Sequence, residues 1–224
     1  MSAPVAMRVN GRSTASRFTL PDGPQRVRCA AWQWCRDRAE PAPSIVLVYA
    51  GPGRKRHVCR DAGRFLTTVL ITDIVDSTAT ATRWGDRRWR EVLAQHYAAC
   101  RAEIERGGGE LVNTTGDGVV AIFDGPARAV RAAIAIQARA KAAGIAVRAG
   151  LHAGECERLW DGLAGVAVHI AARVCALAGA NDVITTGTVR DLAVGSMLAF
   201  APRGDHELKG VPDRVPVFSA TDPA

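Results

Sequence analysis

One segment limits the choice of fold more than any other. Residues 65–72, FLTTVLIT, are β-branched and apolar on both faces of an extended chain, which is typical of a central, buried strand. Asp73 follows directly, and a carboxylate in that position is costly to desolvate unless something pairs with it. The segment therefore predicts a buried strand that ends in a charged group.

Helical and extended patterns alternate after this strand. Capping side chains in DST at 76–78 begin a helix that we expect to run to about residue 106, where three glycines stop it. Further helices are predicted at 126–143 and 166–177, and strands at 110–113, 119–123, 146–152, 183–185, 198–200, 206–208 and 215–218. This order predicts an α+β fold of the ferredoxin-like, split βαβ kind, with a central, mostly antiparallel sheet and helices packed on one face.

The N-terminal segment differs from the rest in charge. Residues 1–64 hold 12 Lys and Arg against 4 Asp and Glu, and the other 160 residues hold 17 against 18, so the net charge of +7 belongs to this segment. Prolines interrupt it, and we expect two parts: 1–62, basic and poorly ordered, and 63–224, a folded domain. A basic arm can contact nucleic acid or anionic lipid. Because its arginine clusters lack helical or aromatic framing, a solvated extension is preferred and no nucleic-acid partner is expected.

Composition argues against several other classes of protein. The six cysteines form no C-x-x-C pair and have no partner histidines at zinc spacing, so we expect reduced thiols and no metal cluster. The longest mostly apolar run, 127–143, carries four basic residues and reads as an amphipathic helix, not a membrane span. The first residues lack the apolar core of a secretory signal. We therefore expect a soluble, cytoplasmic protein.

Two aspartates occupy special positions. Asp73 ends the apolar strand, and Asp117 lies at the tip of the predicted hairpin between Gly116 and Gly118, where the backbone can approach a ligand closely. Carboxylates on neighbouring strands can hold two divalent ions about 3.5–4 Å apart, which suits in-line attack at phosphorus. The alternative is that Asp73 caps the next helix and Asp117 only suits a turn. Spacing alone leaves both interpretations open.

Five blocks of sequence carry a resemblance to a known family. They are ITDIVDST (71–78), NTTGDG (113–118), RAGLHAGE (148–155), GVAVHIAAR (165–173) and ELKGVP (207–212). In this order they resemble the blocks of class III adenylate and guanylate cyclase catalytic domains, especially the actinobacterial ones. The resemblance covers residues 65–220 and does not reach the N-terminal segment. It implies the nucleotidyl cyclase version of the α+β fold.

The resemblance implies a two-cation site. Asp73 and Asp117 match the family's metal-binding aspartates, and the carbonyl of Ile74 is expected to help hold one ion. The implied cofactors are two divalent cations, Mg²⁺ or Mn²⁺. One lowers the pKa of the ribose 3′-hydroxyl and the other holds the triphosphate. Ser77 and Thr78 keep the family pattern beside the phosphates and are predicted to bind substrate.

A second set of residues is implied to come from the other protomer of a head-to-tail homodimer. Arg173 matches the arginine that stabilises charge on the transition state, and Lys209 matches a lysine that contacts the phosphates. His169 replaces the usual asparagine four residues before Arg173 and can donate a hydrogen bond to ribose or phosphate. The alternatives are a histidine satisfied within the interface and an arginine in a surface ion pair. A monomer is expected to be inactive.

The sequence departs from the family where the base is selected. Asn113 stands where a lysine usually selects adenine, and an asparagine amide offers both a donor and an acceptor, so it can read either purine. The family's base-reading aspartate falls at Gly162, and the adjacent Asp161 is our candidate for that role after a one-residue adjustment of the loop. Asp76 replaces a glycine that many members have beside the phosphates, and it adds negative charge there.

These observations predict an adenylate cyclase, a phosphorus–oxygen lyase that forms 3′,5′-cyclic AMP and pyrophosphate from ATP. Two alternatives stay open. One is a cyclase with relaxed selection between ATP and GTP, and the other is a weak or inactive cyclase-like dimer that acts as a regulator. Retention of both metal aspartates and of Arg173 favours the enzyme.

Overall fold

The computed structural model describes residues 44–50, 54–60, 64–159 and 162–223, the first two ranges by their backbone alone. The chain divides into two units, Met1–Gly63 and Arg64–Ala224. In the first unit, β1 (Ser44–Ala50) and β2 (Arg54–Arg60) form an antiparallel pair. The expectation of poor order in residues 1–62 falls mostly outside the described residues and stays a prediction.

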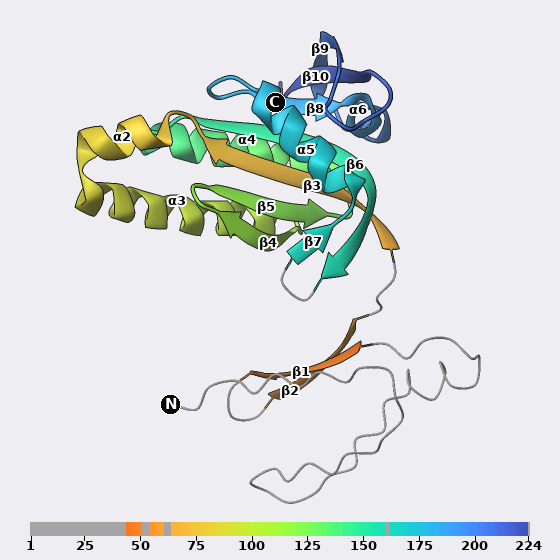
Figure 1. The fold of residues 1–224 in the computed structure, drawn as a ribbon, viewed down its shortest axis with the longest axis horizontal. Helices are drawn as coiled ribbons and strands as arrows, with labels where there is room; N and C mark the ends of the chain where they lie inside the picture. Colours follow the sequence, from red (N-terminus) through yellow and green to blue (C-terminus); the bar gives the residue numbers. More distant parts are fainter. Residues whose placement is uncertain (1–43, 51–53, 61–63, 160–161, 224) are drawn as a thin grey trace, which may run out of the picture. The chain divides into compact units, whose positions relative to one another are not determined.

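The second unit is built on one sheet with the strand order β4-β5-β3-β6-β8-β10-β9, and β7 pairs with β6 (Figure 1). The strands are β3 (Arg64–Ile74), β4 (Glu110–Thr115), β5 (Gly118–Phe123), β6 (Val147–Leu159), β7 (Gly162–Ala164), β8 (Val183–Thr186), β9 (Ala199–His206) and β10 (Val215–Thr221). Their pairings are antiparallel except that of β6 with β8, which is parallel. Because β3 lies between β5 and β6, the prediction of a central strand is confirmed.

The helices of this unit are α2 (Ser77–Trp84), α3 (Asp86–Arg106), α4 (Pro126–Ala142), α5 (Val166–Leu177) and α6 (Gly187–Leu192). The predicted α+β class, with helices on a mostly antiparallel sheet, is confirmed. The single long helix was wrong, because Gly85 adopts a φ of 77° that separates α2 from α3. A separate strand at 206–208 was also wrong, since β9 ends at residue 206. Within the described part of the chain, no helix is long and apolar enough to cross a membrane.

Helices cover both faces of the sheet. Leu70 of β3 belongs to a buried cluster with Ile104 of α3 and Ile136 of α4. Its neighbour Val69 points the other way, into a cluster with Ala171 of α5. In Figure 1, α5 lies in front of the sheet and α4 behind it. The prediction of helices on one face was therefore wrong, because a strand that is apolar on both faces needs a cover on each.

A glycine allows α5 to lie directly on β6. A Cβ atom at Gly150 would be 2.1 Å from the backbone nitrogen of Cys175 and 2.7 Å from the carbonyl oxygen of Ala171. Cβ atoms essentially never come that close to backbone, so only glycine permits this contact between helix and strand. The position of α5 over the sheet therefore depends on Gly150.

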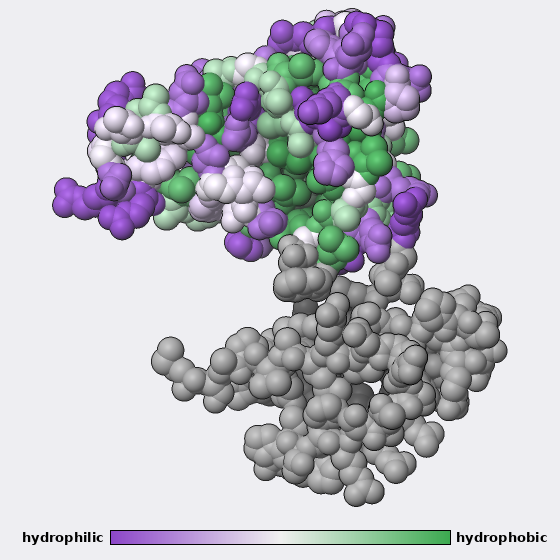
Figure 2. Space-filling view, in the orientation of Figure 1, coloured by the Kyte–Doolittle hydropathy of each residue, from purple (hydrophilic) through white to green (hydrophobic). Residues whose placement is uncertain are grey.

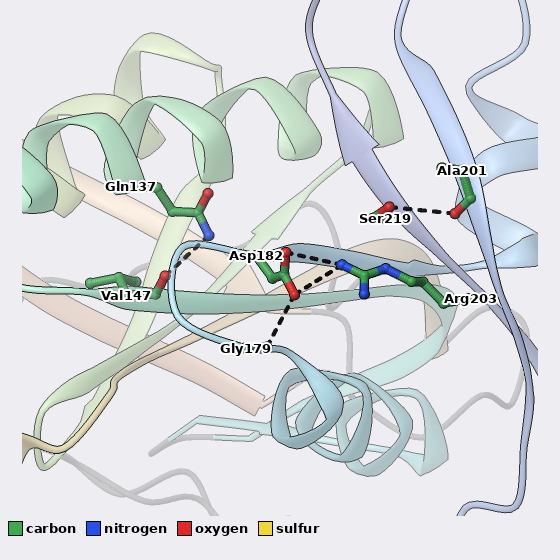
Figure 3. A network of polar contacts seen from close by, with 7 residues as sticks. All are labelled: Gln137, Val147, Gly179, Asp182, Ala201, Arg203 and Ser219. Atoms are coloured by element: carbon green, nitrogen blue, oxygen red, sulfur yellow. Dashed lines mark hydrogen bonds and ion pairs between the residues drawn. The ribbon is translucent and has the colours of Figure 1, made fainter.

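Polar contacts tie the turn after α5 to its surroundings (Figure 3). One carboxylate oxygen of Asp182 accepts a hydrogen bond from the backbone N–H of Gly179 at 3.2 Å, and both oxygens accept from Arg203 of β9 at 3.1 Å. On the other side of β6, the buried side chain of Gln137 on α4 donates to the carbonyl oxygen of Val147 at 3.1 Å. The bonds of Asp182 link the turn after α5 to β9, and the bond of Gln137 links α4 to β6.

Candidate active site

An open pocket of about 600 Å³ lies where β3 ends and α2 begins. It is lined by Asp73, Ile74, Asp76, Ser77, Thr78, Ala79, Asp117 and Arg148. Five of these eight residues are among the predicted metal and phosphate ligands. The pairing of β3 with β5 brings them together, since it places the end of one strand beside the start of the other.

The two aspartates are held by a close contact between their strands. A Cβ atom at Gly118 would lie 2.0 Å from the carbonyl oxygen of Thr72, so the residue after Asp117 must be glycine for β5 to pair here. The hydroxyl of Thr72 also accepts a hydrogen bond from the backbone N–H of Val119 at 3.2 Å. Thr72 is next to Asp73, and Gly118 and Val119 are one and two residues after Asp117, so these contacts fix the two aspartates relative to each other.

Asp73 forms an ion pair with Arg148, a residue that the sequence did not single out. The two face each other across β3 and β6, and Nε and Nη2 of Arg148 donate to Oδ2 of Asp73 at 2.8 and 2.5 Å. The hydrogen bond to Asp73 raises the pKa of Arg148. Asp73 therefore does not act as a helix cap, which was one of the two interpretations left open.

Asp76 lies in the same pocket in an unfavourable backbone conformation. It is the N-cap residue of α2, with φ 53° and ψ 36°, and its side chain makes no capping hydrogen bond. The expected side-chain cap at this residue is therefore absent. L-residues rarely adopt left-handed angles, although aspartate tolerates them better than most. The pocket thus contains a third carboxylate on a backbone turn that would suit glycine.

The donor set of the pocket fits a hard divalent cation. Asp73 and Asp117 supply carboxylate oxygens and Ile74 a backbone carbonyl, which are the ligands that Mg²⁺ and Mn²⁺ prefer. Among the residues described, no group of three or more His, Cys, Asp or Glu side chains is arranged to hold a metal ion. An ion bound here would take its other ligands from backbone, water or a bound phosphate.

The other predicted catalytic and phosphate-binding residues lie on α5 and on the turn beside it, away from this pocket. His169 and Arg173 lie one turn apart on α5, His169 exposed and Arg173 half-buried. A Cβ atom at Gly210 would be 3.8 Å from Nη2 of Arg173, so this guanidinium lies beside the turn that carries the exposed Lys209. Buried Leu208 shares a cluster with α5 and holds the turn there. The pocket that contains the two aspartates is not lined by any of these three predicted residues.

Asn113 lies beside a β-bulge in β4. Leu111 is opposite Ala121 and Asn113 opposite Val120, so the intervening residue of β4 has no partner of its own. Bulges change the direction of a side chain and are common near active sites. Oδ1 of Asn113 accepts a hydrogen bond from the backbone N–H of Thr114 at 2.7 Å. This contact gives the carbonyl oxygen a backbone partner, so the oxygen and the NH₂ group of the exposed amide are not equivalent.

Asn113 and Asp73 project from the same face of the sheet. Cross-strand partners share a face, and Val120 lies opposite both Asn113 and Ile71. Ile71 and Asp73 are two residues apart on one strand and share that face too. It is the face on which α5 packs. Asp161, the other predicted base-reading residue, lies outside the described residues.

By sequence, known proteins match only part of the chain. No protein-family model matches the chain. An uncharacterised protein of Mycobacterium tuberculosis is 31% identical over 124 residues, which is 54% of this chain and 33% of that protein. The chain thus spans only about one third of the length of that curated relative.

Solved structures match a larger share of the chain. The adenylyl cyclase CyaB from P. aeruginosa matches with a TM-score of 0.67 at 19% identity, covering 71% of this chain and 95% of that one. The guanylate cyclase domain of RhGC from Catenaria anguillulae, solved with GTP, matches with a TM-score of 0.65 at 22% identity, covering 72% and 99%. The chain therefore has the fold of class III adenylyl and guanylyl cyclase catalytic domains, as the resemblance predicted.

Proposed function

We propose that this protein is a nucleotidyl cyclase that converts ATP into 3′,5′-cyclic AMP and pyrophosphate. One observation carries the proposal. On a cyclase fold, the pocket at the end of β3 combines two fixed aspartates with the start of a helix. Carboxylates suit divalent cations, and a helix N-terminus suits phosphate. Adenylate activity, rather than guanylate, is the finer part of the proposal and is tested separately below.

In this reaction the ribose 3′-oxygen attacks the α-phosphorus. A bond forms between these two atoms, and the bond from the α-phosphorus to the bridging oxygen of the β-phosphate breaks. Pyrophosphate leaves, and the hydroxyl proton passes to solvent. Asp73, Asp117 and the Ile74 carbonyl would hold two divalent cations, Mg²⁺ or Mn²⁺, which supply Lewis acidity at the 3′-hydroxyl and at the phosphates.

The residues around the aspartates would hold the triphosphate. Ser77 and Thr78 lie at the N-terminus of α2, where backbone N–H groups and hydroxyls can donate to phosphate oxygens. Arg148 lines the same pocket, and its paired N–H donors suit phosphate as well as carboxylate. A cation at Asp73 would compete with Arg148 for that carboxylate, which would leave the guanidinium available to substrate.

A second copy of the chain would complete the site. Arg173, Lys209 and His169 lie outside the pocket of their own chain, so we propose that the partner protomer supplies them. Apolar surface crosses the middle of the face on which α5 packs (Figure 2). Leu66 and Val166 on this unit are 68% and 65% exposed, and such a surface favours burial against another protein surface.

A cyclase-like dimer with little or no activity is the second candidate. Two observations favour it: Asp76 adds a carboxylate where phosphates would bind, and Arg148 occupies Asp73. Both would weaken substrate and cation binding without changing the fold. The two candidates differ in one measurable property, the formation of cyclic nucleotide by the full-length protein with Mn²⁺.

The test uses two inactive variants of the full-length protein. Asp73→Ala removes a ligand of the divalent cations, and Arg173→Ala removes the guanidinium that would stabilise charge in the transition state. Each should lower the rate at least about 100-fold. Mixed and allowed to exchange subunits, they should regain up to about one quarter of wild-type activity, because half the dimers are mixed and each has one intact site. Cyclic AMP is measured by chromatography.

The controls separate the parts of the proposal. Wild-type protein without cyclic nucleotide product, but still dimeric, would support the regulatory dimer. If the wild type is active and Asp73→Ala is equally active, Asp73 is not a required cation ligand. Active wild type whose variants exchange subunits without regaining activity would show that the sites are not shared.

A further inference from the structure

The hairpin turn that carries Asp117 is held from the side by α3. The hydroxyl of Tyr97 donates a hydrogen bond to the carbonyl oxygen of Gly116, the residue before Asp117. The two partners are 19 residues apart in the chain and belong to different elements. This bond is therefore a tertiary contact made to the backbone of the turn itself.

The contacts with Thr72 hold the β5 side of this turn, at Gly118 and Val119, but not its Gly116 side. Gly116 is exposed, adopts a φ of 69°, and a Cβ atom built on it would meet no atom within 4 Å. Thr114 and Thr115 before it are exposed as well. Glycine has the widest conformational freedom of any residue, so a glycine turn without a side contact can change its backbone angles easily. Any such change would move Asp117.

Tyr97 is suited to act as a rigid anchor. Its ring is half-buried and packs against the large core cluster. It is flanked on α3 by His96 and Cys100, which are 3% and 0% exposed and whose Nε2 and Sγ atoms lie 3.4 Å apart. A tyrosine hydroxyl is protonated at neutral pH and can donate; burial, followed by the negative charge of Asp117, raises the pKa of Tyr97 further.

We propose that Tyr97 is a positioning residue: its hydroxyl fixes the Gly116 carbonyl and thereby places Asp117 to bind a divalent cation. This inference rests on the proposed function, because it assumes that Asp117 is a cation ligand. Tyr97 is also one of several large residues of α3 that pack against the core. Its hydroxyl supplies a hydrogen bond that a phenylalanine with the same ring would lack.

The experiment compares Tyr97→Phe with a matched control. Tyr97→Phe keeps the ring and removes one hydroxyl-to-carbonyl hydrogen bond at the Asp117 end of the hairpin. Thr67→Val removes the same kind of bond at the other end, where the Thr67 hydroxyl donates to the carbonyl oxygen of Phe123 at 2.9 Å. Both variants should lose some thermal stability. Only the first should affect the turn.

Two readouts do not depend on turnover. Amide hydrogen exchange of residues 116–118 in the ligand-free protein should be about tenfold faster in Tyr97→Phe and unchanged in Thr67→Val. The Mn²⁺ dissociation constant is measured by electron paramagnetic resonance with 3′-deoxy-ATP, which cannot cyclise. It should rise about three- to tenfold in Tyr97→Phe, the effect expected from one hydrogen bond.

The outcomes distinguish this inference from the proposed function. Unchanged exchange or unchanged Mn²⁺ affinity in Tyr97→Phe, with an active wild type, overturns the inference and leaves the cyclase proposal intact. An equal loss of Mn²⁺ affinity in Thr67→Val also overturns it, because the effect would then be one of general stability. A wild type that neither binds Mn²⁺ nor makes cyclic nucleotide overturns the proposed function, and with it the cation role of Asp117.

Discussion

The substitution Gly150→Ala tests how α5 is held on the sheet. Its new Cβ would lie 2.1 Å and 2.4 Å from the backbone N and Cα of Cys175, against ordinary contact distances of 3.4–4 Å. These are backbone atoms of a helix and cannot rotate away. The helix must therefore move outward by about 1 Å, or β6 must bend, and either change disturbs a close-packed core.

The expected cost is large for a single methyl group. Overpacking a core commonly costs about 1–3 kcal/mol, and a contact with backbone on both sides belongs at the upper end of that range. A loss of about 3 kcal/mol is a large fraction of the 5–15 kcal/mol by which a domain is usually stable. In a domain of this size it lowers Tm by about 6–12 °C. Because α5 carries Arg173, the proposed cyclase activity should fall as well.

The assay is urea unfolding of the full-length protein, followed by circular dichroism, with Gly162→Ala as the matched control. A Cβ at Gly162 meets no atom within 4 Å, so this variant should stay within about 0.5 kcal/mol of the wild type. If Gly150→Ala is as stable as Gly162→Ala, α5 does not lie as close to β6 as the structure has it, and the argument fails.

Two further predictions concern base selection and pH. With its Oδ1 accepting from the Thr114 N–H, Asn113 has its NH₂ group to donate to adenine N1 or to guanine O6, so the ratio of kcat/KM for ATP over GTP should be about tenfold or less. Asn113→Lys combined with Gly162→Asp should raise the preference for ATP at least about tenfold. A wild type that already prefers ATP a thousandfold would contradict the role of Asn113 in loose base selection. Burial lowers the pKa of His152 to about 4, so the unfolded chain takes up this proton at a higher pH than the folded one. Stability should therefore fall by about 1–3 kcal/mol as pH drops from about 6.5 towards 4. His152→Gln should reduce this loss of stability but not abolish it, since burial lowers the pKa of His96 too. The measurement is the urea midpoint at pH 7 and at pH 5. An unchanged midpoint in both the wild type and the variant would refute the pH prediction.

Elements with a strong local signal could be predicted from the sequence. The β-branched, apolar run that ends at Asp73 predicted the central strand, and the helix at 166–177 has the bounds expected from its apolar periodicity. The glycines around Asp117 predicted a turn there, because backbone freedom is a property of the residue itself. The short α6 and β7 were missed, since six and three residues are too few to show a period.

The tertiary structure alone decided which groups meet. Arg148 pairs with Asp73 across 75 residues of chain, and Tyr97 reaches Gly116 from another element. The bulge beside Asn113 likewise depends on the register between two strands. Such contacts follow from the strand order, the register and the face of each strand. These three properties depend on the energy of the whole packed domain and show no local signal in a single sequence. The sequence by itself therefore predicted most of the longer elements and five of the eight residues that line the pocket, and long-range packing decided their partners.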